Sequence, residues 1–252
     1  MLSKSQLQFI KSLHQKKFRK EHGLFIVEGL KSITDFFHSD YAIHSIYCTP
    51  KVEPKIDILK KKIKHYPISE RDLEVISTLK APQGILALIE IPNDPPFYEE
   101  ELRNRFTLVL DTIQDPGNLG TIIRTADWFG IKHIICSEET VESFNPKVVQ
   151  ATMGSLARIS IRYTNLHAFL KGIKLPVFAA ELNGQSIYKT DFGKEGLLIL
   201  GNEGNGIMPG LVNDKTQRIT IPRFGNAESL NVAVSAAIFC SEIGKKYNLD
   251  KS

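Results

Sequence analysis

The stretch FTLVLDTIQDPGNLGTIIRTADWFG occupies residues 106–130 and decides the fold expected of the larger part of this chain. It opens on a continuous apolar run and ends in an amphipathic pattern, with Asp, Asn and Gly between the two. A continuous apolar run is typical of a strand that is buried on both faces, as strands are in parallel sheets. The stretch therefore predicts a buried strand, a polar loop and a helix, and Asn118 is placed to cap that helix.

The same alternation continues to the end of the chain. Further strand candidates are HIIC, RISI, PVFAA, GLLILG and RITI, at residues 133–136, 158–161, 176–180, 196–201 and 218–221. A last helix is expected from about Asn231, with Val232, Ala236, Phe239 and Ile243 on one face. Strands that alternate with helices predict an α/β domain built on a parallel sheet.

The amino-terminal part predicts a smaller α/β domain. Its apolar runs are LFIV, HSIYC and GILALIEI, at residues 24–27, 44–48 and 84–91, and a lysine-rich helix is expected between the last two. Ser69 and Asp72 form a sequence signal for the start of another helix. The stretch IPNDPPFYEE, rich in proline and acids, is typical of a linker. The expected domains are residues 1–92 and 104–252, joined by a linker at 93–103.

Composition narrows the class of protein. The 252 residues are 42% hydrophobic, and no apolar run approaches the ~18 residues that a membrane span needs. The amino terminus lacks the pattern of a signal peptide, so a cytoplasmic protein without a membrane partner is expected. Cys48, Cys136 and Cys240 lie far apart, and the seven histidines include no H-E-x-x-H pattern. The sequence therefore predicts neither a disulfide framework nor a metal site.

Positive charge is concentrated near the amino terminus. The net charge is only +4, but the first twenty residues contain Lys4, Lys11, Lys16, Lys17, Arg19 and Lys20 and no acid. A second run comprises Lys60, Lys61, Lys62 and Lys64. Such runs are typical of proteins that bind a phosphate backbone, and a solvated helix face is the alternative.

Polar clusters rich in glycine or asparagine follow three of the predicted strands. They are the loop after FTLVL, the stretch GNEGNGI at residues 201–207, and the stretch IPRFGNAESLNV at residues 221–232. Ligands of open parallel sheets bind beyond the carboxyl ends of the strands, where these clusters are expected. GNEGNG matches neither the dinucleotide fingerprint nor a phosphate-binding P-loop. Its glycines allow a cofactor to approach the main chain, and a simple tight turn is the alternative.

Together these clusters resemble the SpoU (TrmH-type) family of RNA 2′-O-ribose methyltransferases, in the SPOUT superfamily. The patterns DxxxDPGNxGxxxRTA, LxxGNExxGI and IPxxxxxxSLNV occur in the family's order at residues 111–126, 198–207 and 221–232. The stretches FIVEG and PQGILALIE, at residues 25–29 and 82–90, resemble the ribosomal-protein-like RNA-binding extension that many members carry. The resemblance spans nearly the whole chain.

The resemblance implies a fold and a reaction. The expected fold is a carboxy-terminal parallel-sheet domain tied in a trefoil knot, preceded by a smaller RNA-binding α/β domain. The expected activity is methyl transfer from S-adenosyl-L-methionine to a ribose 2′-hydroxyl of RNA by a homodimer. The amino-terminal extension favours ribosomal RNA as the substrate. The alternatives are a tRNA-directed enzyme, or a non-catalytic RNA-binding or ribosome-assembly factor that keeps only the fold.

The resemblance also assigns roles to residues. The expected catalytic residues are Arg124, Asn118, Glu203, Ser229 and Asn231, and those expected to bind the cofactor are Leu200, Gly201, Gly204, Ile221 and Leu230. Simpler structural roles are alternatives for several of these residues. Arg124 could be a surface residue of a helix, Glu203 could be an exposed acid of a loop, and Ser229 or Asn231 could cap the last helix. Trp128, the one tryptophan, is expected to pack in the core or in a dimer contact.

Overall fold

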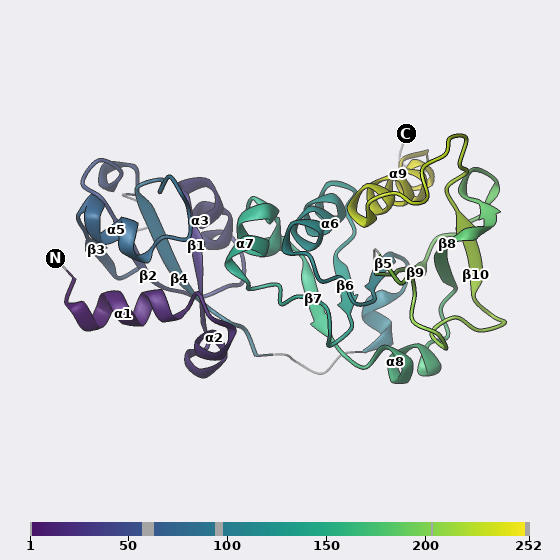
Figure 1. Ribbon diagram of the computed structural model, residues 1–252, viewed down its shortest axis with the longest axis horizontal. Helices are drawn as coiled ribbons and strands as arrows, with labels where there is room; N and C mark the ends of the chain where they lie inside the picture. The colour runs from purple at the N-terminus through teal and green to yellow at the C-terminus, as the bar shows by residue number, and fades with distance from the viewer. Residues whose placement is uncertain (1, 57–62, 94–97, 203, 250–252) are drawn as a thin grey trace. The chain divides into compact units, whose positions relative to one another are not determined.

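The computed structural model describes residues 2–56, 63–93, 98–202 and 204–249. The chain forms two compact units (Figure 1), one made of residues 1–93 with 142–158 and the other of residues 94–141 with 159–252. The predicted linker contains a short 3-10 helix, η2 (Glu99–Leu102), whose Leu102 side chain is fully buried. No helix within the described ranges has the length and apolar character that crossing a membrane requires.

The first unit is built on a four-stranded mixed sheet with the strand order β1-β4-β2-β3. Its elements are α1 (Lys4–Ser12), α2 (Lys16–His22), β1 (Leu24–Glu28), α3 (Leu30–Phe37), β2 (Ile43–Cys48), η1 (Glu53–Ile56), β3 (His65–Pro67), α5 (Glu70–Ile76), β4 (Ile85–Glu90), α7 (Pro146–Thr152) and η3 (Ser155–Arg158). Strands β1, β2 and β4 coincide with the predicted apolar runs, whereas β3 was not predicted, and Ser69 caps α5 by accepting a hydrogen bond from the main-chain N–H of Asp72. The lysine-rich helix predicted near Lys60 lies outside the described residues.

Residues 142–158 leave the second unit and pack in the first. The ring of Phe144 lies 4.6 Å from that of Phe25 on β1, measured between centroids. Arg158 forms an ion pair with Asp35 on α3, with 3.3 Å between nitrogen and oxygen. The strand predicted at residues 158–161 is therefore placed two residues too early, because Arg158 ends the 3-10 helix η3 and the strand begins at Ser160.

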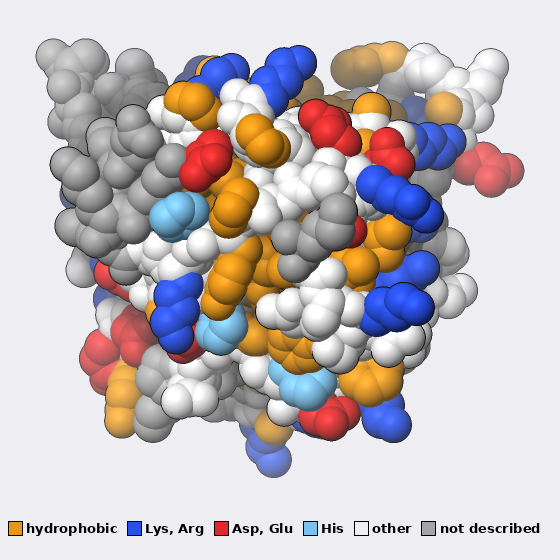
Figure 2. All heavy atoms as spheres, turned by 90° about the vertical axis from the view of Figure 1, so that its left-hand side faces the viewer, with side chains coloured by type: hydrophobic (Ala, Val, Ile, Leu, Met, Phe, Trp, Pro, Cys, Tyr) orange, Lys and Arg blue, Asp and Glu red, His pale blue; other side chains and the backbone are white. Residues whose placement is uncertain are grey.

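Arg19 differs from the other cations of the amino-terminal run. Its side chain is 2% exposed and pairs with Glu142, with 2.6 Å between the two charged groups. Its Nη1 also donates to the main-chain oxygens of Leu13 and His14. The lysines of the run are exposed, and on the face in Figure 2 the described Lys and Arg side chains are interspersed with acids. Arg19 is thus a structural residue, and the lysines alone remain available to a phosphate backbone.

The second unit is built on a six-stranded parallel sheet with the strand order β10-β8-β9-β5-β6-β7. Its elements besides η2 are β5 (Phe106–Leu110), α6 (Pro116–Trp128), β6 (His133–Cys136), β7 (Ser160–Tyr163), α8 (Leu166–Gly172), β8 (Val177–Ser186), η4 (Ile187–Lys189), β9 (Gly196–Leu200), β10 (Gln217–Thr220) and α9 (Val232–Leu249). Helices α6 and α9 cover one face and α8 the other (Figure 1). This confirms the predicted α/β class with a parallel sheet.

Candidate active site

A cavity of about 950 Å³ opens at the carboxyl ends of β9 and β10. The two loops that follow these strands line it, and both belong to the predicted glycine-rich clusters. All five residues expected to bind the cofactor line this cavity: Leu200, Gly201, Gly204, Ile221 and Leu230. Parallel strands bring these loops together because their carboxyl ends lie at the same edge of the sheet.

A bulge in β8 supplies a further wall that the sequence interpretation missed. Along β10, Arg218 pairs with Ala179 but the next residue, Ile219, pairs with Gln185. The residues of β8 in between are displaced from the regular ladder, and residues 180–183 line the cavity. The available signal was the polar run ELNGQS, which follows the apolar residues predicted as a strand and continues β8 to Ser186.

The loop after β9 is closed by its own hydrogen bonds. The main chains of Asn202 and Gly206 exchange two hydrogen bonds of 2.9 Å. The side-chain oxygen of Asn202 accepts from the N–H groups of Gly204 and Asn205, at 2.9 and 3.1 Å. Glycine is required at position 201, because a Cβ there would collide with the backbone of Gly206. These bonds fix the described residues of the loop, 201–202 and 204–207, relative to one another.

The end of β5 holds both ends of this loop. The buried carboxylate of Asp111 accepts from the N–H of Met208 at 2.6 Å, and the amide of Asn202 donates to the carbonyl of Thr112 at 2.9 Å. Thr112 has φ of 57°, which is rare for a β-branched residue and costs about 1–3 kcal/mol. Its hydroxyl donates to Asp111 and its N–H donates to Ser137, both at 2.9 Å. These contacts hold Thr112 in the strained conformation.

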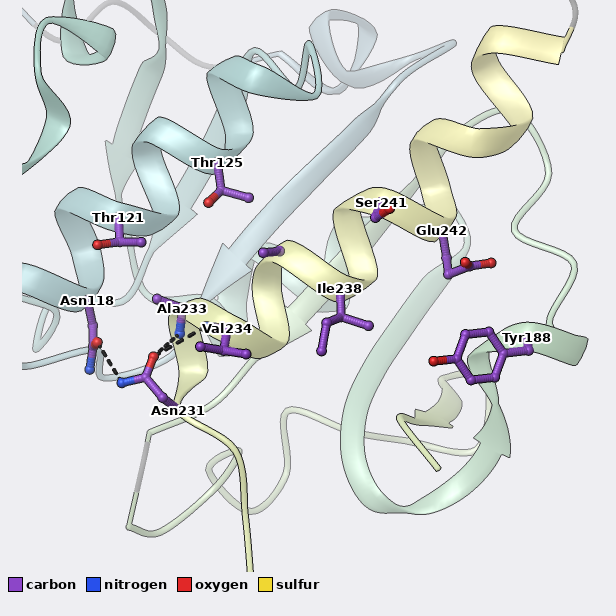
Figure 3. A pocket seen from close by; sticks show the side chains of 11 residues that line it. Asn118, Thr121, Thr125, Tyr188, Asn231, Ala233, Val234, Ile238, Ser241 and Glu242 are labelled. Atoms are coloured by element: carbon purple, nitrogen blue, oxygen red, sulfur yellow. Dashed lines mark hydrogen bonds between the residues drawn. The ribbon is translucent and has the colours of Figure 1, made fainter. Parts of the chain in front are cut away.

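Asn118 has a different structural role from the one predicted. The side chain of Asp115 caps α6 by accepting from the N–H of Asn118 at 2.8 Å, so the prediction that Asn118 is the cap is wrong. The side-chain oxygen of Asn118 instead accepts from the amide of Asn231 at 2.9 Å (Figure 3). Asn231 in turn caps α9 by accepting from the N–H groups of Ala233 and Val234. The first and third clusters therefore meet directly.

The Asn118–Asn231 pair lines a second cavity, of about 610 Å³, between α6, α9 and Tyr188 (Figure 3). Ser229 and Leu230 line the larger cavity, whereas the next residue, Asn231, lines the smaller one. The start of α9 thus separates the two spaces. A ligand in the larger cavity would contact residues, such as Leu230 and Val232, that flank Asn231 in the sequence.

The remaining predicted residues are placed less centrally. Arg124 is exposed on α6 and is absent from the described lining of both cavities. Glu203 lies outside the described residues. Trp128 is 84% exposed, so the expectation of a core position is wrong, and the dimer contact stays a prediction. The reason is its place at the end of α6, on the side of the helix that faces solvent.

The three cysteines, Cys48, Cys136 and Cys240, are buried, and burial raises the pKa of the Cys240 thiol to about 12. Burial also raises the pKa of the Cys136 thiol. Within the described ranges no group of three or more His, Cys, Asp or Glu side chains is arranged to hold a metal ion.

The chain belongs to the SpoU rRNA Methylase family, whose model matches residues 105–241. Residues 4–87 match an MRM3-like substrate binding domain. A curated relative, the 23S rRNA (guanosine(2553)-2′-O)-methyltransferase RlmP of Bacillus subtilis, is 33% identical over 90% of this chain and 91% of its own length. The resemblance in the sequence is thereby confirmed.

Solved structures agree with this membership over both units. An AdoMet-bound rRNA methyltransferase from Sinorhizobium meliloti is 30% identical, with a TM-score of 0.87 over 98% of this chain and 96% of its own. A protein from Porphyromonas gingivalis that is assigned to the TrmH family of RNA methyltransferases is 36% identical, with a TM-score of 0.86 over 98% of this chain and 99% of its own. The fold of the whole chain is therefore that of TrmH-type methyltransferases.

Proposed function

We propose that this protein transfers the methyl group of S-adenosyl-L-methionine to a ribose 2′-hydroxyl of ribosomal RNA. The observation that carries the proposal is the 950 Å³ cavity, which the loops after β9 and β10 line together and which reaches Leu230, the neighbour of Asn231 in the Asn118–Asn231 pair. Membership of the family supports the reaction, and the names of the relatives from Bacillus subtilis and Sinorhizobium meliloti support an rRNA substrate.

The cavity fits this cofactor in size and chemistry. Its volume lies within the range of small-molecule sites, and its lining combines apolar side chains with main chain exposed at glycines. Leu200, Ile221 and Leu230 can enclose an adenine ring, while main-chain groups beside Gly201 and Gly204 can form hydrogen bonds with its edge. When bound, the sulfonium cofactor supplies an electrophilic methyl group.

Residues at the boundary between the two cavities are proposed to prepare the ribose. Asn118 and Asn231 already hold each other, so an incoming hydroxyl meets oriented amides. Ser229 lines the cavity two residues before Asn231 and can donate to or accept from the same sugar. Glu203 is assigned to RNA or to the catalytic arginine by the family resemblance alone.

Arg124 is proposed to grip a phosphate next to the target ribose. Its exposed position on α6 suits a group that contacts RNA lying across the helix. The guanidinium offers a planar pair of donors to phosphate. As the ribose oxygen takes the methyl group from the sulfonium, its proton either passes transiently to Arg124 or passes to another group while Arg124 stabilises the alkoxide. Arg124→Lys keeps the positive charge and loses this geometry, so we expect kcat to fall at least tenfold in a methyl-transfer assay. Transfer at the normal rate by Arg124→Lys would exclude the geometric role.

We further propose that the protein is a cytoplasmic homodimer with a trefoil knot in its carboxy-terminal unit, as the family resemblance implies. The face formed by α6 and α9 is the proposed dimer contact. Trp128 on α6 and Val234 on α9 are 84% and 49% exposed, and Tyr188 on η4, which lines the same cavity as Val234, is 60% exposed. Exposed apolar surface of this kind favours association with a second protein surface.

The proposed reaction is tested by mapping 2′-O-methylated positions in cellular RNA with and without the gene. Loss of methylation at a position in ribosomal RNA supports the proposal, whereas loss in tRNA would reassign the substrate. Purified protein incubated with labelled S-adenosyl-L-methionine and unmodified rRNA transcript provides the direct assay. If the protein neither binds the cofactor nor transfers a methyl group, the non-catalytic RNA-binding alternative is favoured.

A further inference from the structure

The mouth of the 950 Å³ cavity carries three exposed apolar side chains, two of which, Leu182 and Phe224, have no part in the proposed cofactor site. Leu182, Phe224 and Leu230 all line the cavity, and their side chains are 71%, 95% and 48% exposed. Scattered apolar residues are common on protein surfaces, but these three converge on one opening. Phe224 is the most exposed of the large hydrophobic residues described, so its ring is open to a partner.

The loop that carries Phe224 is tied in place beside the cavity. Arg223 donates from Nη1 to the main-chain oxygen of Ala227 at 3.3 Å, which bridges the two sides of the loop around the aromatic residue. The loop follows β10 and leads into α9, both of which are packed in the unit. Phe224 is therefore presented by an anchored segment and not by a chain end.

Charge at this opening is balanced among the described residues. Arg218 is paired with Glu181 at 2.9 Å, and the other charged lining residues are one cation, Arg223, and one acid, Glu228. A balanced rim gives little electrostatic attraction for a phosphate backbone. An open aromatic ring gives instead a stacking surface, and every nucleobase has a face that can stack on it.

We propose that Phe224 is a stacking platform for a nucleobase of the RNA, either that of the methylated nucleotide or its neighbour. The inference rests on the proposed function. In a nucleotide the base and the 2′-oxygen are attached to adjacent carbons of one sugar. A 2′-oxygen that reaches a methyl donor in this cavity therefore brings its own base to the rim. Leu182 extends the apolar surface on which that base rests.

The inference predicts a defect in RNA binding that leaves cofactor binding intact. Phe224→Ala should raise KM for unmodified rRNA transcript about 5- to 150-fold, the change expected for the loss of one base–aromatic stack. Phe224→Trp should keep KM within about threefold of the wild type, because it preserves a stacking ring. All variants should bind S-adenosylhomocysteine with unchanged affinity in calorimetry. Tyr98→Ala is the matched control, since Tyr98 is a 59% exposed aromatic outside the cavity lining.

Three results would overturn the inference. The first is a Phe224→Ala variant with the KM of the wild type, and the second is a Phe224→Trp variant as impaired as Phe224→Ala. The third is a fall in molar mass of Phe224→Ala in light scattering, which would assign the ring to a contact with another copy of the chain. A wild-type protein that transfers no methyl group to RNA would instead refute the proposed function, so the two failures are distinguishable.

Discussion

Removal of the Asp111 carboxylate is expected to weaken cofactor binding without unfolding the protein. In Asp111→Ala, the N–H of Met208 loses an acceptor at 2.6 Å and the hydroxyl of Thr112 loses one at 2.9 Å. A hydrogen bond to a charged group contributes about 1.5–3 kcal/mol. The bond to Met208 holds the cofactor loop, so its full loss would reduce affinity by about 10- to 150-fold, at 1.4 kcal/mol per factor of ten.

The assay is calorimetric titration of each variant with S-adenosylhomocysteine, the chemically stable product of the cofactor. Asp111→Asn is the conservative variant, because its amide oxygen can accept from Met208 while its nitrogen donates to the hydroxyl of Thr112. We expect Asp111→Asn to bind within a few-fold of the wild type. Asp115→Ala removes a comparable carboxylate–N–H bond at the cap of α6 and should cost about 1 kcal/mol of stability with no loss of cofactor affinity.

Two outcomes would refute this reasoning about the loop. One is wild-type affinity in a folded Asp111→Ala variant, which would mean that the loop keeps its shape without the carboxylate. The other is equal weakening in Asp111→Asn and Asp111→Ala, which would point to the charge and not to the hydrogen bonds. Thermal unfolding of each variant shows whether a loss of affinity reflects the loop or a general loss of structure.

Two further predictions concern the dimer and the first unit. Trp128→Ala should shift the molar mass measured by light scattering from dimer towards monomer, because it removes the most exposed ring of the α6–α9 face; an unchanged mass in dilute solution would place the contact elsewhere. Glu142→Gln should lower the free energy of unfolding in urea by about 3 kcal/mol, since Arg19 is 2% exposed and would be left as a buried charge without its partner. Replacement of both residues by Met and Leu should restore much of that stability, and failure of this double variant to do so would contradict the explanation.

The sequence was most informative where structure depends on neighbouring residues. The runs FTLVL and HIIC correspond to β5 and β6 residue for residue, because a continuous apolar run commits a segment to a buried strand wherever it packs. The start of α5 at Ser69 could also be predicted, because the cap is a contact between residues only three positions apart in the sequence. The motif patterns also identified the loops that line the larger cavity.

Only the tertiary structure decided how these segments meet. The cap at Asp115 is a local feature, since Pro116 follows it at the first helical position, but the partner of Asn118 is Asn231, which lies 113 positions further along the chain. In the sequence, Arg19 is one of several cations in a basic run. It pairs with Glu142 because residues 142–158 pack in the first unit. The bulge of β8 likewise depends on its register with β10. A local pattern determines whether a segment tends to form a helix or a strand. The Asn118–Asn231 contact, the burial of Arg19 and the bulge of β8 depend instead on contacts between segments that are distant in the sequence.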